Sequence, residues 1–265
     1  MAPAARLLAS AAVAAALALS VAGCKTTSDD ITGSLAAAPS SPRTDADWRR
    51  SLDAWGARYR ENPGNAAAAI AYARALRATG QRAQAVAVLE QANMRNPNDM
   101  KLLGAFGLAL ADAGQYQKAL DALSRAHTPD EPDWHILNAQ GAVLDQMGRH
   151  NEAQRYYAAA LKIMPNEPSV LSNIGLSYAL MKDLKHAEDT LRFAAAQPGA
   201  EPKVRQNLAL VVGLQGRFAE AERIAAADLP PDEAAANVEY LRQMIAQQNA
   251  KKLGGPYVPP PDAGN

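Results

Sequence analysis

Residues 168–199 read PSVLSNIGLSYALMKDLKHAEDTLRFAAAQPG, and this stretch decides the fold. The apolar and small residues of its first half recur at the spacing i, i+3, i+4, i+7, which marks one face of an α-helix. They are Leu171, Ile174, Gly175 and Tyr178. The pair Lys182-Asp183 then interrupts the pattern, and a second helical spacing follows at Ala187, Leu191 and Ala194. The stretch therefore predicts two amphipathic helices joined by a short turn.

The same pattern returns along the chain with a period of 34 residues. One ladder of alanines keeps this step, at Ala85, Ala119, Ala153, Ala187 and Ala221. A second ladder of small residues keeps it as well, at Ala73, Gly107, Gly141, Gly175 and Ala209. Small residues mark places where two helix backbones come close, because a bulky side chain would overpack the contact. The ladders predict five repeats, which begin near residues 66, 100, 134, 168 and 202.

A 34-residue period with small residues, glycine turns and prolines at fixed places resembles the tetratricopeptide repeat (TPR), a helix–turn–helix unit. The resemblance implies an all-α TPR solenoid of about five repeats in an array that spans residues 47–228, including an N-terminal half-repeat at residues 47–63. Such an array needs polar ends, since each repeat buries its face only against its neighbours. We therefore expect a C-terminal capping helix at residues 229–252 and a disordered Gly/Pro-rich tail at residues 253–265.

The chain opens with the features of a secretory signal peptide, at residues 1–23. Its apolar run of about fifteen residues is short for a membrane-spanning helix, which needs roughly 20. The run ends Val21-Ala22-Gly23-Cys24, which resembles the lipobox of bacterial lipoproteins. The resemblance implies that Cys24 is acylated, and Lys25 after it favours the periplasmic face of the outer membrane. The alternative is an ordinary signal peptide, or an anchor helix, with a chance cysteine.

Residues 24–46 contain the lipobox cysteine and a stretch dominated by Ser, Thr, Asp, Gly and Pro. Such a composition buries too little apolar surface to offset the entropy of the chain. We expect a flexible tether, which at this length spans roughly 25 Å.

Composition and motifs also bear on chemistry. Lys+Arg and Asp+Glu both number 27, so the formal net charge is +0 and nucleic-acid binding is not indicated. A single cysteine excludes a disulfide framework and a cysteine-based zinc site. The histidines lack metal-ligand spacing, and no phosphate-binding loop or nucleophile motif is present. We therefore expect a protein that is not an enzyme and has no metal site, cofactor or small-molecule substrate.

Binding is the remaining role, and we expect the first helices of the repeats to line a groove. In repeat four the second face of this helix carries Ser169, Asn173, Leu176 and Leu180, and in repeat five it carries Lys203, Asn207, Leu210 and Leu214. In peptide-binding TPR proteins such asparagines often bond the ligand backbone, so the resemblance implies a peptide groove here. The alternative is that the leucines pack against the adjacent helix and the asparagines face water.

A lipobox, a short tether, about five TPRs and a polar tail together resemble the TadD-like TPR lipoproteins of the tight-adherence (Tad/Flp) pilus machinery. The resemblance covers the whole chain, and it implies an assembly factor that holds or positions a secretin or another secretion component. An adaptor that regulates a cell-envelope enzyme, or that serves outer-membrane or peptidoglycan machinery, is the alternative and would use the same groove.

Overall fold

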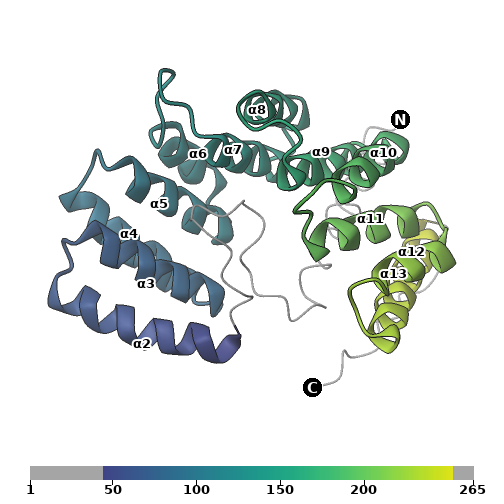
Figure 1. The fold of residues 1–265 in the computed structure, drawn as a ribbon, viewed down its shortest axis with the longest axis horizontal. Coiled ribbons are helices and arrows are strands. Elements are labelled where there is room, and N and C mark those ends of the chain that lie inside the picture. Colours follow the sequence, from purple (N-terminus) through teal and green to yellow (C-terminus); the bar gives the residue numbers. More distant parts are fainter. Residues whose placement is uncertain (1–43, 253–265) are drawn as a thin grey trace. The chain divides into compact units, whose positions relative to one another are not determined.

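The computed structural model describes residues 44–252 of the chain, and this part is folded as twelve α-helices without a β-strand (Figure 1). The helices divide into two compact units between Pro165 and Asn166. The N-terminal unit holds α2 (Asp45–Glu61), α3 (Ala66–Ala78), α4 (Arg82–Arg95), α5 (Met100–Asp112), α6 (Tyr116–Ser124), α7 (Trp134–Gln146) and α8 (His150–Ile163). The C-terminal unit holds α9 (Pro168–Leu180), α10 (Leu184–Ala195), α11 (Pro202–Leu214), α12 (Phe218–Ala225) and α13 (Pro231–Lys252).

The first helix of each pair has defined ends that follow from its sequence. α3, α5, α7, α9 and α11 are all 13 residues long and begin 34 residues apart. The side chains of Asn65, Asp99 and Asp133 cap the first three of these helices by accepting hydrogen bonds from backbone N–H groups. In α9 and α11 a proline occupies the first turn, where no N–H is needed.

Each pair turns through a residue in the left-handed backbone region. Gly80, Gly114, Gly148 and Gly216 have φ between 73° and 83° at this place, where glycine carries no steric penalty. In the fourth pair the equivalent residue is Lys182, with φ of 66°. The turn therefore keeps its geometry from pair to pair although one of its residues is not glycine.

Within the N-terminal unit the paired helices touch at the small-residue positions. A Cβ atom placed on Gly141 of α7 would lie 2.4 Å from Cε1 of Tyr157 on α8, and one on Gly107 would lie 2.6 Å from Cγ of Leu123. Both large partners are fully buried. Each glycine thus provides the space into which one large side chain of the paired helix packs.

The C-terminal unit keeps this contact in its first pair and changes it in its second. Gly175 of α9 faces Leu191 of α10, where an added Cβ would lie 2.6 Å from Cγ. In the second pair the corresponding positions are Ala209 and Ala225, both small and both buried. A further close approach occurs between α11 and α13, where a Cβ on Gly213 would lie 2.5 Å from Cδ2 of Leu241. The capping helix therefore supplies a large side chain to the fifth repeat.

Each end of the described chain carries one helix outside the repeats, α2 at the start and α13 at the end. At the start, the expected half-repeat is α2, which begins at Asp45 because Thr44 and Asp47 form a capping box. At the end, α13 buries Ala234, Val238 and Leu241, while its exposed residues are mainly polar. Ala234 and Val238 pack into the core of the C-terminal unit.

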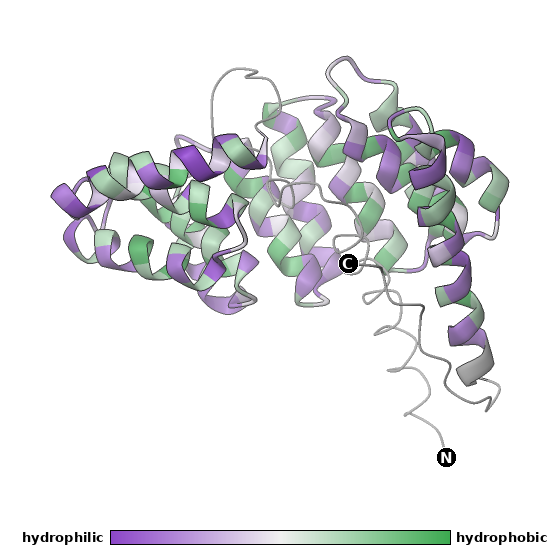
Figure 2. Ribbon diagram, turned by 90° about the horizontal axis from the view of Figure 1, so that it is seen from below, coloured by the Kyte–Doolittle hydropathy of each residue, from purple (hydrophilic) through white to green (hydrophobic). Residues whose placement is uncertain are grey.

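Hydrophobic and hydrophilic residues alternate along the helices (Figure 2), as expected of helices that bury one face. None of the helices at residues 44–252 is long and apolar enough to cross a membrane. The expected signal peptide at 1–23, Cys24, most of the tether at 24–46 and the tail at 253–265 lie outside the described residues.

The contact between paired helices can be tested on α8, which offers a matched pair of alanines. Ala153 is fully buried, whereas Ala158 on the same helix is exposed. Ala153→Arg overpacks the contact, which lowers the free energy of unfolding by about 1–3 kcal/mol, and it also buries an unpaired charge. We therefore expect a clear fall in melting temperature. Ala158→Arg should change stability by less than about 0.5 kcal/mol. Equal melting curves for the two variants, followed by circular dichroism, would show that the helix register is wrong.

Candidate functional site

The predicted groove residues lie on two neighbouring helices of the C-terminal unit. Asn207 of α11 donates a hydrogen bond from Nδ2 to Oγ of Ser172 on α9, at 2.9 Å. Ser172 is buried, so this bond satisfies a hydroxyl group that would otherwise be costly to desolvate. The two first helices are thus joined side by side. We call the surface that they share the Leu/Asn face, and it consists of Ser169, Asn173, Leu176, Leu180, Lys203, Asn207, Leu210 and Leu214.

The four leucines of the Leu/Asn face are half-buried, and none belongs to the packed core of the C-terminal unit. That core is built instead from Leu191, Leu208, Val211 and Val212, together with the small residues around them. Leu176 and Leu180 are one helical turn apart on α9, and Leu210 and Leu214 repeat this spacing on α11. The arrangement leaves four aliphatic side chains partly open to solvent on adjacent helices.

The polar members of the face are already engaged within the chain. Asn207 uses one amide hydrogen for Ser172, and the hydroxyl of Ser169 donates to Oε1 of Glu167 at 2.9 Å, at the start of α9. Asn173 and Lys203 also have polar or electrostatic contacts of their own. From the sequence alone we expect these residues to be free to bind a ligand, whereas in the structure Ser169 and Asn207 form hydrogen bonds within the chain. The leucines are therefore the part of the face with the largest unused capacity for contact.

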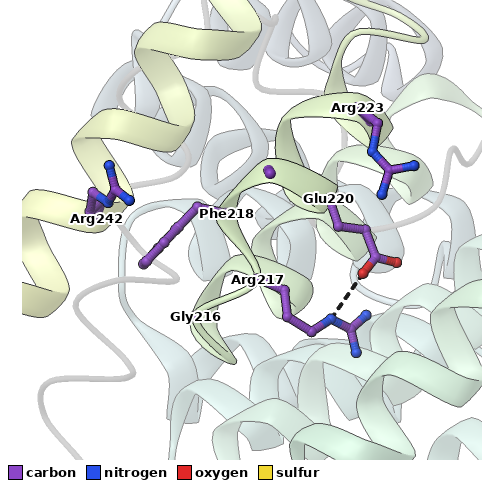
Figure 3. Close-up of a pocket in the computed structure, with 7 residues that line it drawn as sticks. Gly216, Arg217, Phe218, Glu220, Arg223 and Arg242 are labelled. Atoms are coloured by element: carbon purple, nitrogen blue, oxygen red, sulfur yellow. Dashed lines mark hydrogen bonds and ion pairs between the residues drawn. The ribbon is translucent and has the colours of Figure 1, made fainter.

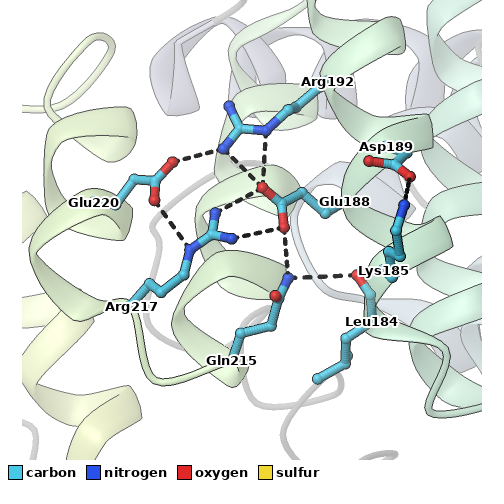
Figure 4. Close-up of polar contacts among 8 residues, drawn as sticks. All are labelled: Leu184, Lys185, Glu188, Asp189, Arg192, Gln215, Arg217 and Glu220. Atoms are coloured by element: carbon cyan, nitrogen blue, oxygen red, sulfur yellow. Dashed lines mark hydrogen bonds and ion pairs between the residues drawn. The ribbon is translucent and has the colours of Figure 1, made fainter.

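In the same unit a largely buried carboxylate, that of Glu188, links the fourth and fifth repeats (Figure 4). Glu188 of α10 receives hydrogen bonds from Nη2 of Arg217 at 2.6 Å, from Nε of Arg192 at 2.8 Å and from Nε2 of Gln215 at 2.8 Å. Both arginines also contact Glu220, at 2.6 and 3.0 Å. The side chain of Glu188 is only 12% exposed, so its charge depends on these donors. The Arg217 guanidinium, ahead of the other donors, lowers the pKa of Glu188 to about 2.

Sequence reasoning missed this network for a simple reason. The pair Glu188 and Arg192 is visible as an i, i+4 ion pair on one helix. Arg217 and Gln215 come from the turn between α11 and α12, so only the fold brings them to Glu188.

A second polar cluster lies in the N-terminal unit. The carboxylate of Asp145 accepts hydrogen bonds from the Tyr157 hydroxyl at 2.8 Å and lies 2.8 Å from Nδ1 of His150. Burial, with the nearby Asp145 charge, raises the pKa of Tyr157 well above its usual range. In residues 44–252 no three His, Cys, Asp or Glu side chains are grouped so that they could hold a metal ion.

Comparisons with known proteins match this architecture. Family models of the tetratricopeptide repeat match residues 56–105 and 135–167. No curated protein matches the chain in sequence. The all-α TPR fold expected from the sequence is confirmed by these matches and by the twelve helices of the described residues.

Solved structures share the same fold. The thermophilic TPR protein TTC0263 from Thermus thermophilus is 20% identical, with a TM-score of 0.60 over 69% of this chain and 100% of that one. PilW, a type IV pilus biogenesis factor, is 16% identical, with a TM-score of 0.61 over 73% and 91% of the two chains. A TPR protein from Parabacteroides merdae is 15% identical, with a TM-score of 0.59 over 78% and 82%. The chain is thus built from repeats of a kind that form protein-interaction scaffolds.

The contribution of Glu188 to stability can be tested by its dependence on pH. Because the pKa of Glu188 falls from 4.5 to about 2 on folding, its contribution to stability is full above pH 4.5 and is lost as the pH falls towards 2. Glu188→Gln should lower the free energy of unfolding at pH 7, by up to about 3 kcal/mol. The difference from wild type should shrink between pH 4.5 and 2 in urea titrations. Glu222→Gln, at an exposed site on α12, is the control, and an equal effect of both changes would contradict the network.

Proposed function

We propose that this protein is a lipid-anchored TPR scaffold of the bacterial envelope, which binds a protein partner through the Leu/Asn face. The observation that carries the proposal is the set of four half-buried leucines on α9 and α11, outside the packed core. Large aliphatic side chains held partly in solvent by rigid helices are suited to receive the apolar side chains of a partner.

The size of the face is consistent with a specific but reversible contact. Completing the burial of a half-exposed leucine contributes roughly 1 kcal/mol, so four leucines contribute several kcal/mol before the costs of association. The polar groups around them, Ser169, Asn173, Lys203 and Asn207, would form the rim and fix the direction of the bound segment. Asn207 can do so with its carbonyl oxygen, because its amide group is held by Ser172.

The envelope location rests on the N-terminal sequence. The string from Val21 to Cys24 resembles a lipobox, and acyl chains on Cys24 would anchor the chain stably to a membrane. Lys25 favours the outer membrane, with the folded repeats on the periplasmic side. Residues 24–46 would then let the repeats reach partners roughly 25 Å from the membrane surface.

Assembly of a Tad/Flp-type pilus, or of its outer-membrane secretion apparatus, is the role that we propose for this scaffold. The proposal rests on the resemblance of the whole chain to TadD-like lipoproteins. PilW supports it only in that a protein of the same fold is a pilus biogenesis factor. The expected partner is a secretin or another component of the secretion apparatus.

Anchoring is tested first. Cys24→Ala should abolish incorporation of labelled palmitate, and the protein should either leave the membrane fraction or accumulate as its precursor. Labelling and detergent-phase partitioning like those of wild type would show that Cys24 is not the lipid attachment site.

The role of the Leu/Asn face is tested by complementation of a strain that lacks the gene. The wild-type gene should restore surface pili and secretin multimers in the outer membrane. Leu176→Ala combined with Leu210→Ala should not, because the loss of two central apolar contacts weakens binding by at least about 10-fold. Phe193→Ala removes a side chain that is 49% exposed on α10 and serves as the control. Normal pili in the strain without the gene would refute the pilus role, and restoration by the leucine variant would refute the face.

A further inference from the structure

A second surface of the C-terminal unit lies on other helices, between the turn that precedes α12 and the capping helix α13. It is a shallow depression of about 450 Å³ around the ring of Phe218. Arg217, Glu220 and Arg223 lie on one side of the ring and Arg242 on the other (Figure 3). We call this surface the Phe218 depression. Its lining carries three guanidinium groups and one carboxylate, and two further carboxylates, Glu222 and Glu239, border Phe218 and Arg242 on the adjoining surface.

The charges of the depression are not equally available. Arg217 is held by the Glu188 carboxylate and lies 3.0 Å from Glu220, so these residues neutralise each other within the network described above. Arg223 is exposed, and within the described residues its side chain makes no hydrogen bond or ion pair. Arg242 is 60% exposed and forms a long ion pair of 3.7 Å with Glu239. The guanidinium of Arg223 is therefore open to an external anion, and that of Arg242 keeps donors that its long contact with Glu239 does not use.

Phe218 adds an apolar element between these two cations. The guanidinium of Arg242 lies 5.0 Å from the centre of the Phe218 ring, within the range of a cation–π contact. This contact holds the planar group in place, so its remaining donors lose less freedom when they bind a carboxylate. Part of the ring's own surface packs against the core, since Phe218 adjoins the core cluster of this unit.

We infer that the Phe218 depression is a docking site for an acidic peptide segment of a protein partner. One carboxylate of the segment pairs with Arg223 and another with Arg242, while an aromatic or aliphatic side chain between them lies against Phe218. Guanidinium and carboxylate form paired, charge-assisted hydrogen bonds, which favours this chemistry over a neutral peptide. The chain as a whole carries a formal net charge of +0, so the attraction is local and does not extend to anionic polymers in general. The site is independent of the Leu/Asn face, because it uses α12 and α13 rather than α9 and α11.

The test uses the full chain in detergent and a labelled synthetic peptide in which one phenylalanine is flanked by Asp and Glu. Binding is followed by fluorescence anisotropy, and it should weaken as salt is raised. The same peptide with lysine in place of each acid should not bind. Arg223→Ala combined with Arg242→Ala should weaken binding of the acidic peptide by at least about 10-fold, because two exposed charge pairs and a cation–π contact are lost.

The control replaces two exposed arginines outside this unit, Arg49→Ala with Arg155→Ala, and should leave the affinity within about 2-fold, since net charge alone is then altered. Leu176→Ala with Leu210→Ala should also leave it unchanged, which separates this site from the proposed partner face. Equal weakening by both arginine pairs, or no weakening by either, would overturn the inference. The inference would also be overturned if the protein did not bind the peptide but bound vesicles of anionic phospholipid through Arg223 and Arg242.

Discussion

The close approach of two paired helices is the constraint on which the rest of the structure depends. Glycine or alanine on the first helix leaves the space that one large residue of the second helix fills, as Tyr157 does at Gly141 and Leu191 does at Gly175. A methyl group at either glycine would lie within 2.6 Å of the partner's carbon atoms. Because interiors are packed to crystal-like density, such a contact fixes the distance between the helices of a pair. The faces that remain are then available for stacking and for binding.

Where the contact between a small and a large residue is missing, other interactions stabilise the repeat. The fifth repeat has Ala209 and Ala225 at the corresponding places, and its second helix, α12, has only 8 residues. The C-terminal unit offsets this loss in two ways. Leu241 of the capping helix packs against Gly213. Glu188 of repeat four accepts hydrogen bonds from Arg192 of the same repeat and from Gln215 and Arg217 of repeat five.

The two surfaces of the C-terminal unit differ in the physical force that they offer. The Leu/Asn face presents aliphatic carbon, which favours apolar side chains without regard to sequence direction. The Phe218 depression presents guanidinium groups, whose attraction is directional and screened by salt. A scaffold with both can hold two segments of one partner, or segments of two partners, in a fixed relation. Such linked binding raises affinity beyond that of either contact alone.

The sequence by itself determined the helical period, the place of each turn and the small residues at the helix contacts, because these are local or strictly periodic properties. It also indicated the second face of α9 and α11. It did not reveal that Asn207 is bonded to Ser172, that Ser169 belongs to the start of its helix, or that Glu188 is the centre of an ion-pair network. These contacts join residues up to 35 positions apart. The contact of Ser169 with Glu167 is local, but those of Asn207 and Glu188 are decided only by the tertiary structure. The energy of a buried charge or amide group depends on which distant partners desolvate and satisfy it.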